Sequence, residues 1–168
     1  LKYLEVNECH LLQRVDALKG LTSLIYLILN DCSSLQNIDG IQNLKNITDL
    51  TLTGCAYLQS TEDLKELTNL ETLTLDKCQK LQNIDSLKSN TKLNSLSLSN
   101  CPELQNIDPI TGLTKLRHFI SDGPIALQNL ELLKSNSHLI VYLDARNMPS
   151  DERQKLREAL PNAIIRDK

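Results

Sequence analysis

Five cysteines recur along this chain at a constant interval of 23 residues. They are Cys9, Cys32, Cys55, Cys78 and Cys101. Aliphatic residues, nearly all of them leucine, stand eight, five and three residues before each cysteine and three residues after it. The pentapeptide LQNID occupies residues 35–39, 81–85 and 104–108, at separations of 46 and 23 residues, which are multiples of the same interval. A period of this length is typical of proteins built from stacked, structurally equivalent repeats.

The apolar residues within one repeat indicate its local structure. Two leucines separated by one residue, such as Leu27 and Leu29, point to the same face of a short strand. After the cysteine, apolar residues recur every three positions, which suits a short helix or 3-10 turn on the opposite wall. One repeat cannot bury its own leucines, so we expect neighbouring repeats to stack into a solenoid of about seven parallel strands, roughly 34 Å long.

Written as L-x-x-L-x-L-x-x-C-x-x-L, the repeat resembles the leucine-rich repeat family. The resemblance implies an α/β fold, a right-handed solenoid or horseshoe with a parallel concave sheet and short helical or 3-10 turns on its convex side. It covers residues 1–147, as about six units and a degenerate last one. The cysteine and the leucine three residues after it are similar to the cysteine-containing repeats of F-box substrate receptors and plant immune receptors.

Residues 148–168 break the repeat and are predicted to form a C-terminal cap. A helix is expected to begin at Ser150, which two acidic residues follow, and to end at Pro161. A short strand over residues 163–165 would then close the sheet. The chain also begins in the middle of the pattern, from which we expect a further segment upstream of Leu1.

The strand alternation is ambiguous near the end of the repeats, where apolar residues occupy both parities. A strict continuation of the period would bury Tyr142 and Asp144. A shift of one residue would instead turn Val141, Leu143 and Ala145 inward. We favour the shift, because burying an unpaired carboxylate at Asp144 costs several kcal/mol.

An acidic residue recurs seven residues after each cysteine position, just before the expected helical wall. These residues are Asp16, Asp39, Glu62, Asp85, Asp108 and Glu131. A carboxylate at such a place can accept the free backbone N–H groups that begin a helix. Pro109, directly after Asp108, fits the first helical position. We therefore predict that these acids cap the helices, in preference to forming a cation-binding edge.

The cysteines admit three interpretations. Zinc ligands normally come in closely spaced pairs that converge tetrahedrally, whereas residues 23 apart would lie in a line. Disulfides between neighbours would have suitable separation but poorly directed Cβ atoms. We favour buried free thiols that act as small apolar groups, with Asn147 in the equivalent position of the last repeat. No metal or cofactor is expected, and unpaired thiols favour a reducing compartment such as the cytoplasm.

The sequence does not indicate an enzyme. His118 is expected on the exposed sheet face, where Ser95 could touch it, but Asp49 would lie beyond Ser95 on the wrong side for a Ser-His-Asp relay. Neither G-x-S-x-G nor H-E-x-x-H occurs. The net charge of −3 gives no basic footprint for nucleic acid, and the longest apolar run, residues 24–29, is too short to span a membrane.

The outward residues of the strands are predicted to form the binding surface, as is usual for solenoids. The candidate binding residues are Tyr26, Ile28, Asn30, Asp49, Thr51, Thr72, Thr74, Asp76, Ser97, His118 and Ile120. The predicted function is that of a monomeric protein-recognition module, within a larger receptor, ubiquitin-ligase adaptor or secreted bacterial effector. A purely structural spacer is the alternative. An ice-binding surface is more remote, because threonines do not align in matched columns.

Overall fold

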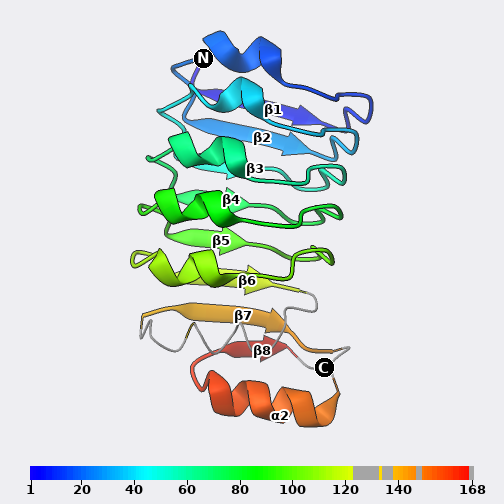
Figure 1. Cartoon of the computed structure of the whole chain (residues 1–168), viewed down its shortest axis with the longest axis vertical. Helices are drawn as coiled ribbons and strands as arrows, with labels where there is room; N and C mark the ends of the chain where they lie inside the picture. The colour runs from blue at the N-terminus through cyan, green and yellow to red at the C-terminus, as the bar shows by residue number, and fades with distance from the viewer. Residues whose placement is uncertain (123–132, 134–137, 147–148, 167–168) are drawn as a thin grey trace.

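The computed structural model describes residues 1–122, 133, 138–146 and 149–166. These residues form one parallel sheet of eight strands whose spatial order follows the chain (Figure 1). The strands are β1 (Tyr3–Asn7), β2 (Tyr26–Asn30), β3 (Asp49–Thr51), β4 (Thr72–Thr74), β5 (Ser95–Ser97), β6 (His118–Ser121), β7 (Ile140–Asp144) and β8 (Ile164–Arg166). The predicted solenoid, with seven repeat strands and a cap strand, is confirmed.

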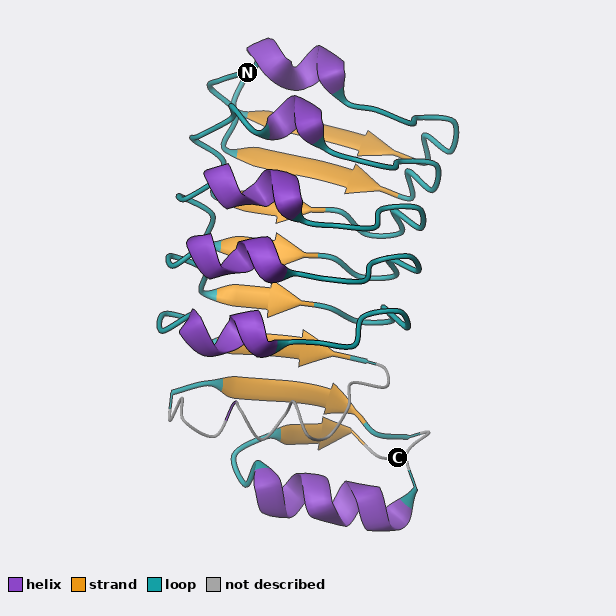
Figure 2. Ribbon diagram, viewed as in Figure 1, coloured by secondary structure: helices purple, strands orange, loops and turns teal. Residues whose placement is uncertain are grey.

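Five 3-10 helices lie in a row along one side of the sheet (Figure 2). They are η1 (Asp16–Gly20), η2 (Asp39–Ile41), η3 (Glu62–Glu66), η4 (Asp85–Ser89) and η5 (Asp108–Gly112). We call this row the helical wall. Inward leucines of the strands pack against it, and Leu27, Leu50 and Leu73 are fully buried. Each repeat thus contributes one strand, one turn at the cysteine and one short helix to a shared core.

The predicted capping role of the acidic residues is wrong. Asp16, Asp39, Glu62, Asp85 and Asp108 each occupy the first residue of a 3-10 helix, as their spacing suggested. Within the described residues none of these carboxylates accepts a hydrogen bond from a backbone N–H, and the residue before each helix makes no side-chain cap. In two repeats a side chain two residues before the acid accepts the backbone hydrogen bond instead. Ser60 Oγ accepts from Glu62 N at 3.1 Å, and Asn106 Oδ1 accepts from Asp108 N at 2.8 Å. Glu131 lies outside the described residues.

Pro109 lies in the first turn of η5, as predicted, where its missing N–H leaves no helical hydrogen bond unmade. The corresponding residue of η2 is Gly40, and its position is set by close approach. A Cβ atom there would lie 2.1 Å from the carbonyl oxygen of Val15 in the preceding repeat. Only glycine lets the backbones of η1 and η2 come this near.

The shifted alternation of β7 is confirmed. Val141, Leu143 and Ala145 are buried, while Tyr142 and Asp144 remain part-exposed. In the sheet, Phe119 lies opposite Val141, and His118 lies opposite Ile140. The shift keeps the Asp144 carboxylate on the solvent side, where it does not require a buried partner.

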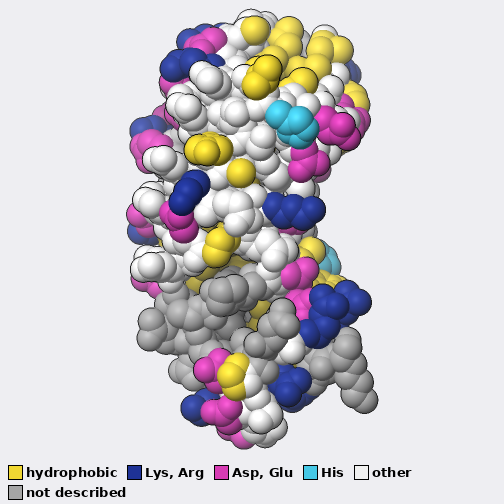
Figure 3. Space-filling model, turned by 90° about the vertical axis from the view of Figure 1, so that its right-hand side faces the viewer, with side chains coloured by type: hydrophobic (Ala, Val, Ile, Leu, Met, Phe, Trp, Pro, Cys, Tyr) yellow, Lys and Arg dark blue, Asp and Glu magenta, His cyan; other side chains and the backbone are white. Residues whose placement is uncertain are grey.

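The hydrophobic core is covered to different extents at the two ends of the solenoid. At the C-terminal end, helix α2 (Ser150–Ala159) buries Leu156 against the last strands, as expected of a cap. At the N-terminal end, Leu4, Val6 and Leu12 are only partly buried, and hydrophobic side chains gather on the surface (Figure 3). The predicted boundary between repeats and cap, at residues 147 and 148, lies outside the described residues.

The residue before each cysteine has a left-handed backbone, a feature that the sequence analysis did not predict. These residues are Glu8, Asp31, Gly54, Lys77 and Asn100, with φ between 53° and 71°. Each backbone N–H donates to a carbonyl of the next repeat; that of Asp31, for example, reaches Thr53 O at 2.7 Å. The left-handed turn therefore links neighbouring repeats at the point where each strand ends. Only one of the five residues is glycine, so the residue types gave little indication of the left-handed backbone.

Candidate functional site

The cysteines line the core beside this turn as free thiols. Cys32, Cys55, Cys78 and Cys101 are buried and Cys9 is exposed. The thiol of Cys55 donates to Leu29 O at 3.5 Å, and that of Cys78 donates to Leu52 O at 3.2 Å. Burial raises the pKa of the Cys55 thiol to about 12. The predicted ladder of buried free thiols is confirmed for Cys32, Cys55, Cys78 and Cys101 but not for Cys9, and the buried sulfur atoms serve as weak donors between successive repeats. Asn147 lies outside the described residues.

The opposite surface of the sheet, which we call the sheet face, carries the outward side chains of β1–β8. Parallel pairing aligns these side chains in rows across the strands. One row is Tyr3, Tyr26, Asp49, Thr72, Ser95, His118 and Ile140, and the next is Glu5, Ile28, Thr51, Thr74, Ser97, Ile120, Tyr142 and Ile164. Asn30 ends β2, and Asp76 lies two residues beyond the end of β4, in a third row. Every residue predicted to bind a partner therefore lies on this face.

Two tyrosines mark the N-terminal end of the sheet face. The rings of Tyr3 and Tyr26 are tilted by 44°, with centroids 6.5 Å apart, and the side chains are 49% and 45% exposed. Glu5 accepts hydrogen bonds from Tyr3 Oη at 2.5 Å and from Asn7 Nδ2 at 2.8 Å. These bonds, that of Tyr3 first, lower the pKa of the Glu5 carboxyl, so it carries its charge at neutral pH. The result is an exposed aromatic pair beside a negative charge.

The middle of the sheet face is hydroxylic, and its Asp76 carboxylate is held by the next repeat. Asp76 Oδ1 accepts from Ser97 Oγ at 2.6 Å and from the backbone N–H of Ser99 at 2.9 Å. Asp122 N in turn donates to Ser99 Oγ at 3.2 Å. Ser97 and Ser99 are buried, at 7% and 6% exposure, which for Ser97 differs from the outward position predicted. Their hydrogen bonds orient the Asp76 carboxylate.

The C-terminal end of the sheet face is again aromatic and aliphatic. His118 stacks on Tyr142, with ring centroids 6.4 Å apart and planes 24° from parallel. Ile120 lies beside Tyr142, while Ile140 and Ile164 are 37% and 52% exposed. Tyr142, Ile140 and Ile164 were not among the candidate binding residues. The shifted alternation of β7 could have identified Tyr142, because it follows directly from keeping Asp144 exposed.

Beyond this end, Arg146 forms a bidentate ion pair with Asp144. This hydrogen-bonded pairing lowers the pKa of the Asp144 carboxyl to about 2. The charge of Asp144 is thus matched within the chain, unlike those of the carboxylates in the middle of the face.

The strand order separates the residues of the rejected catalytic relay. Ser95 lies opposite His118, but Asp49 is two strands from Ser95 on the side away from His118. In the part of the chain that the structure describes, no group of three or more His, Cys, Asp or Glu side chains is arranged to hold a metal ion. No described helix has the length and apolar character required to cross a bilayer.

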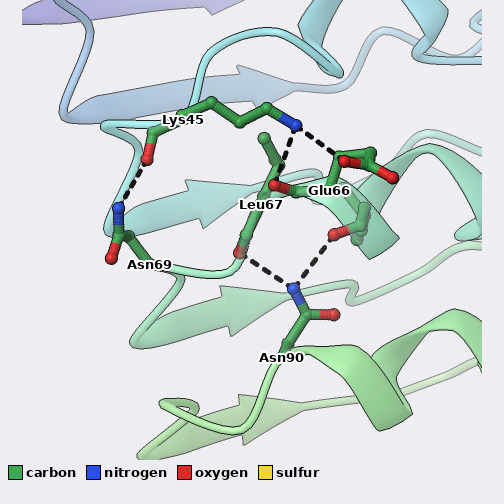
Figure 4. A network of polar contacts seen from close by, with 6 residues as sticks. Lys45, Glu66, Leu67, Asn69 and Asn90 are labelled. Atoms are coloured by element: carbon green, nitrogen blue, oxygen red, sulfur yellow. Dashed lines mark hydrogen bonds and ion pairs between the residues drawn. The ribbon is translucent and has the colours of Figure 1, made fainter.

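Several charged side chains of the helical wall and its loops are paired within the chain. Lys45 Nζ donates to Glu66 Oε2 at 2.9 Å and to Glu66 O at 3.1 Å, while Asn69 Nδ2 donates to Lys45 O at 2.8 Å (Figure 4). The hydrogen bond from Lys45 lowers the pKa of the Glu66 carboxyl. A similar ion pair joins Lys65 to Glu62 within η3 at 2.6 Å. The contacts of Lys45 connect the loop after η2 to η3 and to the loop after η3.

Two buried polar groups also join repeats under the wall. Asn90 Nδ2 donates to Leu64 O at 3.0 Å and to Leu67 O at 2.9 Å, which satisfies carbonyls at the end of η3 (Figure 4). Thr61 Oγ1 and Ser86 Oγ are 2.7 Å apart, and Ser86 Oγ donates to Thr61 O at 2.6 Å. At the positions equivalent to Thr61 the other repeats carry aliphatic residues, and at those equivalent to Asn90 they carry leucine, except for Asn136. The sequence analysis missed all three residues, although Thr61 and Asn90 are visible as polar residues in columns that are otherwise mostly aliphatic.

Comparison with known proteins places the repeat in a family. The model of the BspA type leucine rich repeat region matches residues 6–136 in six copies. No curated protein sequence matches the chain significantly.

Among solved structures, the chain is similar to the functional domain of InlJ from Listeria monocytogenes, which includes a cysteine ladder. The two are 21% identical with a TM-score of 0.48, over 76% of this chain and 33% of that one. It is also similar to a leucine-rich repeat protein of Leptospira interrogans, at 15% identity and a TM-score of 0.39, over 98% of this chain and 53% of that one. The chain thus spans about a third and about half of the length of these two proteins.

Proposed function

The chain belongs to the BspA-type leucine-rich repeat family, and from this premise we propose that it is a non-enzymatic module that recognises another protein on its sheet face. Leucine-rich repeat domains are general scaffolds for protein interaction, which makes this class of function the starting point. The type of repeat differs from the F-box and plant receptor types that the cysteine spacing resembled. The cysteine spacing therefore does not support the prediction that the module lies within one of the larger proteins named in the sequence analysis.

One observation carries the proposal: aromatic and aliphatic side chains that are exposed or part-exposed lie at both ends of an aligned face whose other outward residues are hydroxylic or acidic. Tyr26 and Ile28 lie at one end, and His118, Ile120 and Tyr142 lie at the other. Aromatic residues dominate the free energy of most protein interfaces, and surrounding polar residues exclude water from them. Strand pairing fixes all of these positions before a partner arrives, so little conformational entropy would be lost on binding.

The proposal is tested by blocking the middle of the sheet face. Thr74 lies in β4 with its side chain outward, and both Thr74→Arg and Thr74→Glu add bulk with opposite charge. Each immobilised variant is compared with the unmodified chain for the proteins it retains from an extract of the producing organism, identified by mass spectrometry. We expect at least one protein retained by the unmodified chain to be lost with both variants.

The matched control is Thr91, which is exposed in the loop between η4 and β5. Thr91→Arg and Thr91→Glu add the same groups away from the sheet face and should leave that protein bound. Equal loss with the Thr91 variants, or a set of retained proteins unaffected by any Thr74 variant, would contradict recognition through this face. The second result would favour the structural spacer.

A further inference from the structure

Building on the proposed function, we propose that the partner presents a lysine or arginine side chain to the N-terminal end of the sheet face, where the Tyr26 ring and the Asp49 carboxylate receive it. The occupant would be an extended, positively charged segment of another protein. The inference concerns the chemistry of that segment, which the proposed function leaves open.

The geometry of adjacent strands brings an aromatic ring and a carboxylate together. Tyr26 and Asp49 are direct partners in the pairing of β2 with β3, so their side chains leave the same row of the sheet about 5 Å apart. On the other side of Tyr26 lies Tyr3, which is tilted against it and bonded to Glu5. The Tyr26 ring is therefore flanked by carboxylates on both sides. A cation over the ring would gain from the π electrons and from both negative charges.

The carboxylate of Asp49 is oriented but not neutralised. Thr48 Oγ1 donates to Asp49 Oδ2 at 2.6 Å. No ion pair between Asp49 and a described Lys or Arg is present, and none joins Glu5 to one. The hydroxyl bond fixes the carboxyl plane, which leaves Oδ1 for a donor from outside the chain. This arrangement favours the planar fork of an arginine or the compact ammonium of a lysine.

The sign of charge along the first six strands of the face supports the same occupant. From β1 to β6 the outward charged residues are Glu5, Asp49, Asp76 and Asp122, and no outward position holds Lys or Arg. The chain as a whole carries 18 Lys and Arg against 21 Asp and Glu, so the composition does not impose this bias. Asp76 is held by two donors of the next repeat without a cation. A positively charged segment that lies across the strands would meet only acidic charge, which also speeds association.

The test uses fluorescein-labelled peptides of alternating arginine and serine, with a glutamate–serine peptide of equal length as the charge control. Binding to the full chain is measured by fluorescence anisotropy at low salt. We expect the arginine peptide to bind and the glutamate peptide not to bind. Asp49→Asn removes the charge at constant size, and Tyr26→Leu removes the ring but keeps an apolar surface. Each should weaken binding about threefold, and the pair together about tenfold.

Asp85→Asn is the matched control, because Asp85 is an exposed acid of the helical wall. It should change the affinity less than the threefold expected of Asp49→Asn. If Asp85→Asn weakens the arginine peptide as much as Asp49→Asn does, attraction is only a general effect of net charge and the inference is wrong. Equal binding of the glutamate peptide would overturn it as well.

A second readout separates this inference from the proposed function. A protein retained in the capture experiment is tested against the Tyr26→Leu, Asp49→Asn double variant. Loss of that protein supports cation recognition at this place. Its retention by the double variant, together with its loss by Thr74→Arg and Thr74→Glu, would overturn the cation site while the recognition role of the sheet face stands.

Discussion

The helical wall and the sheet face are built from the same repeat, yet they treat charge in opposite ways. On the wall, Glu62 and Glu66 pair with lysines of the chain, which lower the pKa of Glu66. On the sheet face, Asp49 and Asp76 are held by hydroxyl and backbone donors and by no described cation. Several charges of the wall are thus paired within the chain, whereas Asp49 and Asp76 on the face are oriented without a cation from the described residues.

The largest expected effect comes from breaking the packing of the wall. In Gly40→Ala, the new Cβ would meet the Val15 carbonyl oxygen at 2.1 Å and Asp16 N at 2.9 Å, both of which are backbone atoms that cannot swing aside. We expect a loss of about 3 kcal/mol or more in the free energy of unfolding, measured by urea denaturation. The control is Gly112→Ala at the end of η5, where a Cβ meets nothing within 4 Å. Similar losses from both substitutions would show that helix contact does not set the Gly40 position.

A serine on each surface gives a direct comparison of wall and face. Ser86→Ala removes the buried donor to Thr61 O and leaves the Thr61 hydroxyl without its partner. The expected cost is about 2 kcal/mol, because buried polar groups without partners are expensive. Ser95→Ala, on the part-exposed face, should stay within about 0.5 kcal/mol. Thermal unfolding of the two variants checks the difference, which equal midpoints would contradict.

The cysteine ladder lies in the core between the two surfaces. Cys55→Ala loses a weak hydrogen bond to Leu29 O and leaves a small cavity, so we expect it to cost about 1–2 kcal/mol. Cys9→Ala, at an exposed position, should cost almost nothing.

The same contrast should govern thiol reactivity. Because burial raises the pKa of Cys55 to about 12, a thiol reagent should modify it slowly in the folded chain and rapidly in denaturant, while Cys9 reacts at once. Rapid modification of Cys55 without denaturant would contradict the buried ladder.

The smallest effect is expected from the surface ion pairs of the wall. Lys45→Met should raise the pKa of Glu66 towards its ordinary value of 4.5, which NMR titration can measure. Since the folded state lowers this pKa, the stabilisation is present above pH 4.5 and is lost as the pH falls through the lowered pKa. A Glu66 pKa that Lys45→Met leaves unchanged would show that the pair is not formed in solution.

The sequence predicted the solenoid because its period is strict in the core. Leucine and cysteine spacing fixed the strands, the thiol ladder and the positions of the helices, and the cost of burying Asp144 fixed the shift of β7. The same reasoning failed for the acids at the helix starts. A carboxylate at the first helical residue is beyond the N-cap position and finds lysine or arginine instead, as Asp16 does with Arg14 at 2.6 Å.

The sheet face was predictable in outline only. Strand alternation correctly placed residues such as Tyr26 and Thr74 outward, because side chains alternate with period two. It could not foresee that Ser97 would be buried, since that depends on a hydrogen bond to Asp76 from the neighbouring repeat. Whether the predicted residues bind a partner stays a prediction.

The Thr61–Ser86 bond has a consequence for how such a chain finds its correct alignment. Repeats this similar could dock out of frame, one full unit along, or exchange with those of a second copy. After a displacement of 23 residues, Ser86 would face Ile38, and Thr61 would face Pro109. Ser86 could still donate to the backbone carbonyl there, as it does to Thr61 O, but the Thr61 hydroxyl would be buried without a partner, at a cost of about 1–3 kcal/mol. One polar pair at a single interface thus favours the correct alignment of similar repeats over an alignment shifted by one unit.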